Sequence, residues 1–190
     1  MNQMCKLAAF IQVSLDGYFA DSDGGIGWAY KEPTDAEWNS FVAGNARGGG
    51  QLLFGRITYE FLASYWPTPM AAASSPVVAE RMNSLPKMVF SHTLDAAPWQ
   101  NTTLIKGDLV SEVRRAKQAD GPDMAILGSG SVVTQLAQAR LIDELQIVVN
   151  PIVLGKGSAL FDGIRDSFPL QLTATRSFHN GNVFLSYAPG

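Results

Sequence analysis

The sequence predicts a three-layer α/β fold with a mostly parallel central sheet, an antiparallel C-terminal edge hairpin and helices on both faces. Over most of the 190 residues, short apolar runs alternate with longer segments of helical periodicity, which is the pattern of repeated βα units. Near the C-terminus, residues 170–178 and 183–187 flank Asn180-Gly181, a strong signal for a hairpin turn. The alternation predicts the parallel part of the sheet, and the hairpin predicts its antiparallel edge.

The short apolar runs predict the strands, and the segments between them predict the helices. Strands are expected over residues 7–13, 51–54, 87–91, 102–105, 124–127, 144–149, 170–178 and 183–187. Helices are expected over residues 34–45, through 59–65, from 75 onward, over 108–119 and over 131–140. The stretch 67–76, PTPMAAASSP, is predicted to be a surface loop because proline and serine interrupt both periodicities.

Several predicted helices begin with residues suited to a helix start. Thr34 and Glu37 have the spacing of a capping box, in which the two side chains bond to each other's backbone N–H groups. Pro76 would occupy a first helical position, and Asp108 can cap the next helix. The apolar face of the first helix would hold Trp38, Phe41 and Val42.

Composition limits the class of protein. A chain of 190 residues with 46% hydrophobic and 16% charged residues can form one globular domain, here taken as 1–190. A net charge of −3 gives no reason to expect a nucleic-acid binder. The single Cys5 and the separated His92 and His179 predict no dedicated metal site. No apolar run is long enough to span a membrane, so a cytoplasmic protein is expected.

The turn Gly128-Ser129-Gly130-Ser131 is the strongest candidate for ligand binding. It joins a short apolar strand to a predicted helix, and the first turn of a helix has free N–H groups at the positive end of its dipole. Such turns also serve only to close βα units, and the sequence alone favours neither role. Val133 stands where a Rossmann fingerprint needs its third glycine, and Gly157 follows Lys156 where a Walker A loop needs Ser or Thr.

Two other strand ends carry groups that suit phosphates. Gly55 lets the backbone turn closely, Arg56 offers a planar fork of donors, and Thr58 can cap a helix. Ser91 and His92 follow the strand KMVF. Each segment alone also fits an ordinary surface loop. Because the carboxyl ends of parallel strands meet at one edge of a sheet, the three segments together predict a dinucleotide site.

Five segments together resemble the dihydrofolate-reductase-like superfamily and, within it, the RibD C-terminal family of riboflavin-biosynthesis reductases. They are SLDGYFADSDGGIGW, LLFGRITYEFL, LPKMVFSHTL, MAILGSGSVVTQLA and LIDELQIVVNPIVLGKGSALF. The last, with its PxxLGKGxxLF pattern over residues 151–161, favours the riboflavin-type branch over true folate reductases. The resemblance implies an NADPH-dependent reductase similar to 5-amino-6-(5-phosphoribosylamino)uracil reductase.

The resemblance also implies roles for individual residues. Arg56, Ser91 and His92 would meet the adenosine 2′-phosphate, and a cis peptide would join Gly128 to Ser129. The other expected cofactor contacts are Gly55, Ile57 and Thr58 around the phosphates, Gly128, Ser129, Gly130, Ser131 and Val132 in the pyrophosphate loop, and Gln12, Phe19, Ala20 and Ile26 around the nicotinamide.

The proton donor and the substrate are less defined. Folate reductases have an acidic residue in the helix after the first loop, and the candidates here are Asp35, Glu37 and Asp16. Acids at a helix start also stabilise its dipole, so a purely structural role stays open. The substrate pocket would lie between the first loop, 16–28, and the helix 34–45, with walls formed by Trp28, Tyr30, Tyr65 and Trp66.

Three functions remain in competition. The first is reduction of a small heterocyclic, carbonyl or imine substrate with NADPH, the second is direct reduction of dihydrofolate, and the third is NADPH binding without turnover. The deaminase domain that accompanies full riboflavin reductases is not part of this sequence, which leaves the substrate open. Members of the family often pair, so a homodimer that binds a small molecule and no membrane is expected.

Overall fold

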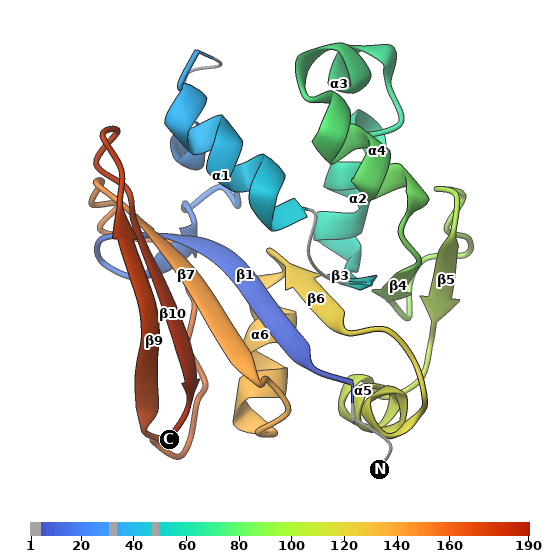
Figure 1. The fold of residues 1–190 in the computed structure, drawn as a ribbon. Helices are drawn as coiled ribbons and strands as arrows, with labels where there is room; N and C mark the ends of the chain where they lie inside the picture. Colours follow the sequence, from blue (N-terminus) through green and yellow to red (C-terminus); the bar gives the residue numbers. More distant parts are fainter. Residues whose placement is uncertain (1–4, 31–33, 47–49) are drawn as a thin grey trace.

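The computed structural model describes residues 5–30, 34–46 and 50–190 (Figure 1). Its strands are β1 (Leu7–Ser14), β2 (Tyr18–Ala20), β3 (Gln51–Gly55), β4 (Lys87–Phe90), β5 (Thr102–Ile105), β6 (Met124–Leu127), β7 (Glu144–Asn150), β8 (Ser158–Ala159), β9 (Leu170–Ser177) and β10 (Val183–Pro189). Its helices are the 3-10 turn η1 (Gly27–Ala29), α1 (Ala36–Ala46), α2 (Arg56–Tyr65), α3 (Pro69–Ser74), α4 (Pro76–Ser84), α5 (Leu109–Gln118) and α6 (Gly130–Gln138).

Within these residues the main sheet has eight strands in the order β5-β4-β3-β6-β1-β7-β10-β9. The pairs from β5 through β7 are parallel, whereas β10 runs antiparallel to both β7 and β9. A second, two-stranded sheet pairs β2 with β8. The predicted fold class, a mostly parallel sheet with an antiparallel C-terminal hairpin, is confirmed.

Helices cover both faces of the sheet and leave room on one of them. Figure 1 shows α5 and α6 on one face, and α1 together with α2, α3 and α4 on the other. Leu136 and Val133 of α6 and Val113 of α5 pack on the first face with the apolar side chains of β1 and β6. On the second face, α2 and α4 pack over β3 and β4, while α1 packs over β7 and β10 and also contacts α4. The floor between these two groups belongs to β1 and β6.

The aromatic cluster under α1 explains where that helix lies. Trp38 is 6% exposed and meets Phe178 edge to face at 5.2 Å between ring centroids. Phe41 meets Phe178 at 4.9 Å and Phe184 at 5.1 Å. Edge-to-face contacts of this kind stabilise aromatic pairs beyond their buried area. The predicted apolar face of the helix is confirmed, and its partners are the β9–β10 hairpin and β7.

Two local predictions are wrong. The segment 67–76 contains helix α3, capped by Thr68, whose side chain accepts from the Ala71 N–H at 3.2 Å. Helix α1 is capped by Asp35 and not by Thr34, because Asp35 Oδ1 accepts from the Trp38 N–H at 2.9 Å. Glu37 therefore has no capping role. Pro76 is the first residue of α4, as predicted, and the cap at Asp108 is confirmed, with Asp108 Oδ2 accepting from the Ser111 N–H at 2.9 Å.

Candidate functional site

A cleft of about 1530 Å³ runs along the open face of the sheet. Its floor includes Phe10 and Gln12 of β1 and Leu127 of β6. Val42 of α1 and Met82 of α4 also line it. The cleft thus lies over β1 and β6 and beside these two helices. It reaches the carboxyl edge of the parallel strands, where open α/β sheets bind their ligands.

Two helices begin side by side at this edge. Gly55 precedes α2 and Ser129 precedes α6, and two hydrogen bonds from backbone N–H groups to side-chain hydroxyls join the two helix starts. The Gly55 N–H donates to Ser129 Oγ at 2.8 Å, and the Ser129 N–H donates to Thr58 Oγ1 at 3.0 Å. A serine and a threonine therefore hold the positive ends of two helix dipoles together at the rim of the cleft.

The backbone of the turn is strained in a way that serves this arrangement. Gly128 has φ of 61° and Ser129 has φ of 53°, both in the left-handed region. The Gly128 N–H donates to the Phe10 carbonyl at 3.0 Å, which ties the turn to β1. The peptide bond between Gly128 and Ser129 is trans, so the expected cis bond is wrong. Two consecutive left-handed residues reverse the chain without it.

The first loop closes over this turn through an aromatic ring. A Cβ atom built on Gly130 would lie 2.4 Å from the ring of Phe19, so only glycine allows this approach. Strand β2, which carries Phe19 and Ala20, is held by β8. Gly157 makes that pairing possible, because its φ is 148° and a Cβ there would lie 2.1 Å from the Ala20 carbonyl oxygen. The LGKG part of the 151–161 segment is thus a support for the first loop.

Basic and hydroxyl groups lie along the neighbouring strand ends. Arg56 and His92 line the cleft, and Arg56 Nη1 contacts Glu60 Oε2 at 2.9 Å. The Ser91 hydroxyl also lines it and accepts from the N–H groups of Thr93 at 3.1 Å and Leu94 at 3.0 Å. All the residues expected to contact the cofactor line this one cleft: Gln12, Phe19, Ala20, Ile26, Gly55, Arg56, Ile57, Thr58, Ser91, His92, Gly128, Ser129, Gly130, Ser131 and Val132.

The three candidate acids are engaged elsewhere, and none of them lines the cleft. Asp16 accepts from the N–H groups of Leu154 at 3.1 Å and Gly155 at 2.7 Å. A hydrogen bond from Ser14 and these two backbone bonds lower the pKa of Asp16 to about 2. At neutral pH this carboxylate is ionised and has no proton to give.

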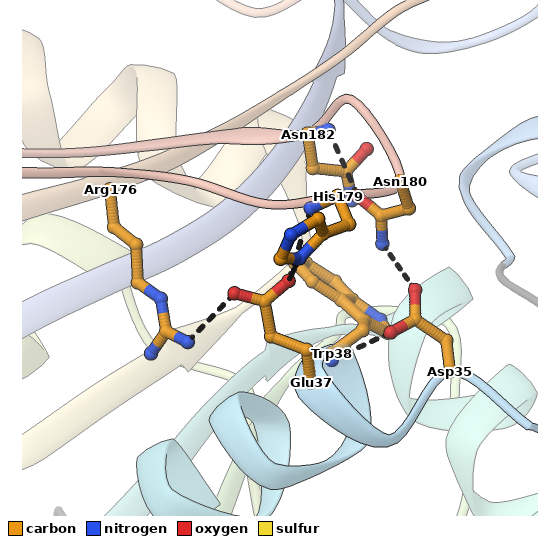
Figure 2. A network of polar contacts seen from close by, with 7 residues as sticks. All are labelled: Asp35, Glu37, Trp38, Arg176, His179, Asn180 and Asn182. Carbon is orange, nitrogen blue, oxygen red and sulfur yellow. Dashed lines mark hydrogen bonds and ion pairs between the residues drawn. The ribbon is translucent and has the colours of Figure 1, made fainter.

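Asp35 and Glu37 attach α1 to the hairpin turn, as Figure 2 shows. Glu37 accepts from the His179 N–H at 3.0 Å, from His179 Nδ1 at 2.8 Å and from Arg176 at 3.1 Å. These bonds, led by the backbone bond from His179, lower the pKa of Glu37 to about 2. Asp35 caps α1 and accepts from Asn180 Nδ2 at 2.8 Å. The arrangement favours a structural role for both acids.

The four aromatic residues expected at the substrate pocket divide into two pairs. Trp28 and Trp66 line the cleft. Tyr30 is 61% exposed and lies outside the cleft lining, as does Tyr65, whose hydroxyl bonds to Ser74 Oγ at 2.9 Å. Two indoles therefore line the cleft, Trp28 from η1 and Trp66 directly after α2.

A row of polar side chains on β7 was missed by the sequence reasoning. Glu144 and Gln146 line the cleft away from the phosphate turn, and Gln146 Nε2 donates to Glu144 Oε1 at 2.8 Å. Ser186 of β10 also donates to this carboxylate oxygen at 2.8 Å. Asn150 lies at the other end of the strand and contacts Gln12. Because alternate strand residues share a face, the spacing of Glu144, Gln146 and Asn150 was the available signal.

Some features of other classes of protein are not found in the described part of the chain. No helix there is long and apolar enough to cross a bilayer. Among the same residues, no three His, Cys, Asp or Glu side chains gather where they could hold a metal ion.

Comparison with known proteins gives relatives over nearly the whole chain. The Bacillus subtilis (strain 168) protein YyaP, an uncharacterized protein, is 27% identical over 177 residues, which cover 93% of this chain and 91% of YyaP. YwjB of the same organism, also uncharacterized, is 28% identical over 173 residues, which cover 91% of this chain and 92% of YwjB.

Solved structures share the fold at lower identity. A Shewanella sp. PV-4 protein named for riboflavin biosynthesis has a TM-score of 0.76 at 24% identity, covering 97% of this chain and 99% of that one. A Thermotoga maritima deaminase/5-amino-6-(5-phosphoribosylamino)uracil reductase has a TM-score of 0.68 at 16% identity, covering 98% of this chain and 57% of that one. Enterococcus faecalis dihydrofolate reductase, complexed with NADP(H), has a TM-score of 0.60 at 17% identity, covering 97% and 96%.

The family model of the RibD C-terminal domain matches residues 5–184. That range includes β1, which is the first strand along the chain. It also includes the paired helix starts of α2 and α6 and the glycine-rich segment that supports the first loop. The chain therefore belongs to the RibD C-terminal domain family.

Proposed function

We propose that the protein binds NADPH along the carboxyl edge of its sheet and reduces a small heterocyclic substrate that enters the same cleft. The observation that carries this proposal is the pair of helix starts locked together by Ser129 and Thr58. Two adjacent helix N-termini offer free N–H groups and positive potential to a pyrophosphate. The ring of Phe19 packs against Gly130 at the start of α6, and both residues line the cleft.

The residues at the edge fit the remaining parts of the cofactor. Arg56, Ser91 and His92 would contact the phosphate that distinguishes NADPH from NADH, since guanidinium and hydroxyl groups bind phosphate well. Phe19 and Ala20 would shield the nicotinamide from water. When bound, NADPH supplies a hydride, and the protein orients the reacting groups.

The names of structurally similar proteins indicate a substrate class. The T. maritima protein is a uracil-derivative reductase, and a Corynebacterium diphtheriae protein of similar fold, at a TM-score of 0.63, is named pyrimidine reductase-like. We propose a pyrimidinedione or a related heterocycle with a C=N or C=O bond to reduce. Trp28 and Trp66 each line the cleft and would offer an indole face to such a ring, because planar heterocycles stack on indoles. Dihydrofolate belongs in the same assay as a competing acceptor.

A second candidate is NADPH binding without turnover. It is favoured by one observation: Asp16, Asp35 and Glu37 are all bound to other groups outside the cleft. The proton for the reaction must then come from water or from another residue. A protein that binds NADPH tightly but oxidises it with no pyrimidine, pterin or carbonyl acceptor would support this second candidate.

Calorimetric titration with NADPH and NADH tests the binding proposal. We expect NADPH to bind more tightly, and Arg56→Ala to cost more than about tenfold in NADPH affinity while leaving NADH unchanged, since hydrogen bonds to charged groups are worth about 1.5–3 kcal/mol. Arg115→Ala is the matched control, because Arg115 also pairs with a glutamate one turn away on its own helix but does not line the cleft. Equal affinity for the two nucleotides would overturn the assignment of Arg56.

We also propose that two copies pair through β9. All eight residues of this edge strand are exposed, and Leu172 is 51% exposed. An edge strand without cover is a template for pairing with a second copy. Light scattering at micromolar concentration should give the mass of a dimer, and Leu172→Lys should give a monomer. A monomeric mass for the unchanged protein would contradict this proposal.

A further inference from the structure

Gln12 places an amide on the floor of the cleft, close to where the nicotinamide is proposed to lie. It belongs to β1, and its position in that strand is paired with Val148 of β7. Its side chain is half-buried and lines the same cleft as Phe19 and Ala20. What this amide offers to a ligand depends on whether its oxygen or its nitrogen faces the cleft.

The contact with Asn150 determines which end of the Gln12 amide faces the cleft. This residue is fully buried, at 0% exposure, and its Nδ2 lies 3.2 Å from Gln12 Oε1, 3.3 Å from the Val13 carbonyl and 3.4 Å from the Val148 carbonyl. Backbone carbonyls accept hydrogen bonds and never donate them. The opposite orientation of Asn150 would set its oxygen against two carbonyl oxygens. The NH₂ group of Asn150 must therefore point this way, and Gln12 must accept with its oxygen.

The consequence is that Gln12 presents its NH₂ group toward the cleft. Within the described residues, Gln12 Nε2 has no hydrogen-bond acceptor of its own, so its donors are available to a ligand. Asn150 maintains this arrangement although its Oδ1 is buried without a partner among those residues. A buried, unpaired oxygen lowers stability, so an apolar residue would suit the fold alone better than Asn150.

We propose that Gln12 is a ligand-selecting donor for a carbonyl oxygen and that Asn150 is the positioning residue that fixes its polarity. The inference rests on the proposed function, because it takes the cleft to hold NADPH and a substrate. A carbonyl oxygen occurs in the carboxamide of nicotinamide and also in a pyrimidinedione. Both groups present a hydrogen-bond acceptor to Gln12. A ligand that turned an N–H donor toward the NH₂ group of Gln12 would be disfavoured, because two donors cannot bond to each other.

The test uses Gln12→Glu, which keeps the shape and the bond from Asn150 but presents an acceptor to the cleft. Its affinity is measured for NADPH, for 2′-phospho-ADP-ribose, which lacks nicotinamide, and for 5-aminouracil added to the NADPH complex. Weaker binding of NADPH alone, by about tenfold or more, identifies the carboxamide as the partner. Unchanged NADPH binding with a similar loss for 5-aminouracil identifies the substrate carbonyl. Wild-type affinity for all three probes overturns the inference.

Asn150 is tested through a double-mutant cycle. Asn150→Ala should weaken the affected probe severalfold in the wild-type background and have no further effect when Gln12→Leu is already present. Losses that simply add would show that Asn150 does not act through Gln12. Asn182→Leu is the matched control: Asn182 is also a fully buried amide, directly before β10, but it has no bond to Gln12. It should leave all three affinities unchanged.

The two levels of the proposal fail in distinguishable ways. If the unchanged protein does not bind NADPH, the proposed function fails and the role of Gln12 fails with it. If NADPH binds and Arg56→Ala weakens it, but Gln12→Glu has no effect on any probe, only the role of Gln12 fails.

Discussion

The hydroxyl of Thr58 should control both the stability of the protein and the shape of its nucleotide cradle. Thr58→Val keeps the size of the side chain but removes the acceptor for the Ser129 N–H, which it binds at 3.0 Å. The N–H is half-buried and belongs to a residue with φ of 53°, a conformation that Ser129 adopts only while its surroundings enforce it. The variant therefore loses a hydrogen bond and a restraint on a strained turn.

The structure sets the expected size of the effect. A neutral hydrogen bond contributes about 1 kcal/mol, and leaving a buried donor unpaired costs about 1–3 kcal/mol. Because this N–H is only partly buried, we expect Thr58→Val to lower the free energy of unfolding by about 1–2 kcal/mol. Ser129→Ala removes the acceptor of the Gly55 N–H, at 2.8 Å, and should have a similar effect. Since both bonds hold the same two helix starts, their effects should not add.

Urea unfolding and NADPH titration together provide the assay. Ser131→Ala serves as the control for stability, because Ser131 lies in the same turn, is exposed, and makes no side-chain hydrogen bond to the described residues. If the cradle is preorganised, Thr58→Val weakens NADPH binding as well as stability. A less stable variant that binds NADPH as tightly as before, or more tightly, would refute the reasoning. That result would mean that Thr58 competes with the ligand for the Ser129 N–H.

Three further predictions concern stability. Burial lowers the pKa of Lys87 from 10.5 to about 8, so between these two pH values the folded protein loses a proton that the unfolded chain keeps. The free energy of unfolding should therefore rise with pH across this window, by at most about 3 kcal/mol, and Lys87→Met should abolish the rise in urea titrations. Glu37 has its pKa lowered from 4.5 to about 2, so its stabilising effect is complete above pH 4.5 and disappears as pH falls toward 2; Glu37→Gln should be less stable at neutral pH and less sensitive to acid, and equal acid sensitivity would count against the hairpin bonds. Asn182→Leu should raise the melting temperature, corresponding to about 1 kcal/mol, because both polar atoms of this buried amide lack partners among the described residues; a lower melting temperature would show that the amide is paired in solution.

The predictions that succeeded depend on local sequence. Apolar runs and the Asn180-Gly181 turn specify strands and their reversal without reference to distant residues, since a glycine with φ of 86° is what the turn needs. The Gly128–Ser131 turn was found for the same reason. Sequence order also brought Arg56 and His92 to the correct edge, because parallel strands all end on one side.

The predictions that failed depend on tertiary partners. Thr34 and Asp35 are adjacent and equally suited to cap a helix, and the choice of Asp35 is accompanied by its bond to Asn180, 145 positions away. Glu37 resembled a capping or catalytic acid until His179 and Arg176 were seen beside it. The alternate spacing of Glu144, Gln146 and Asn150 marks one face of a strand, but the role of Asn150 depends on its contact with Gln12 of β1, which local sequence does not specify.

The helices beside the cleft rest on different halves of the sheet, although α1 and α4 also contact each other. Helix α1 rests on β7 and on the hairpin that Asp35 and Glu37 hold, whereas α2 and α4 rest on β3 and β4. Helix α1 and the pair α2 and α4 therefore lie on different halves of one sheet, with β6 and β1 between those halves. A small change in the twist between β6 and β1 would therefore change the distance between α1 and the helices α2 and α4. A ligand that contacts both groups of helices would oppose that change. Substitutions in the C-terminal hairpin, although remote from the phosphate turn, are therefore expected to change the width of the cleft.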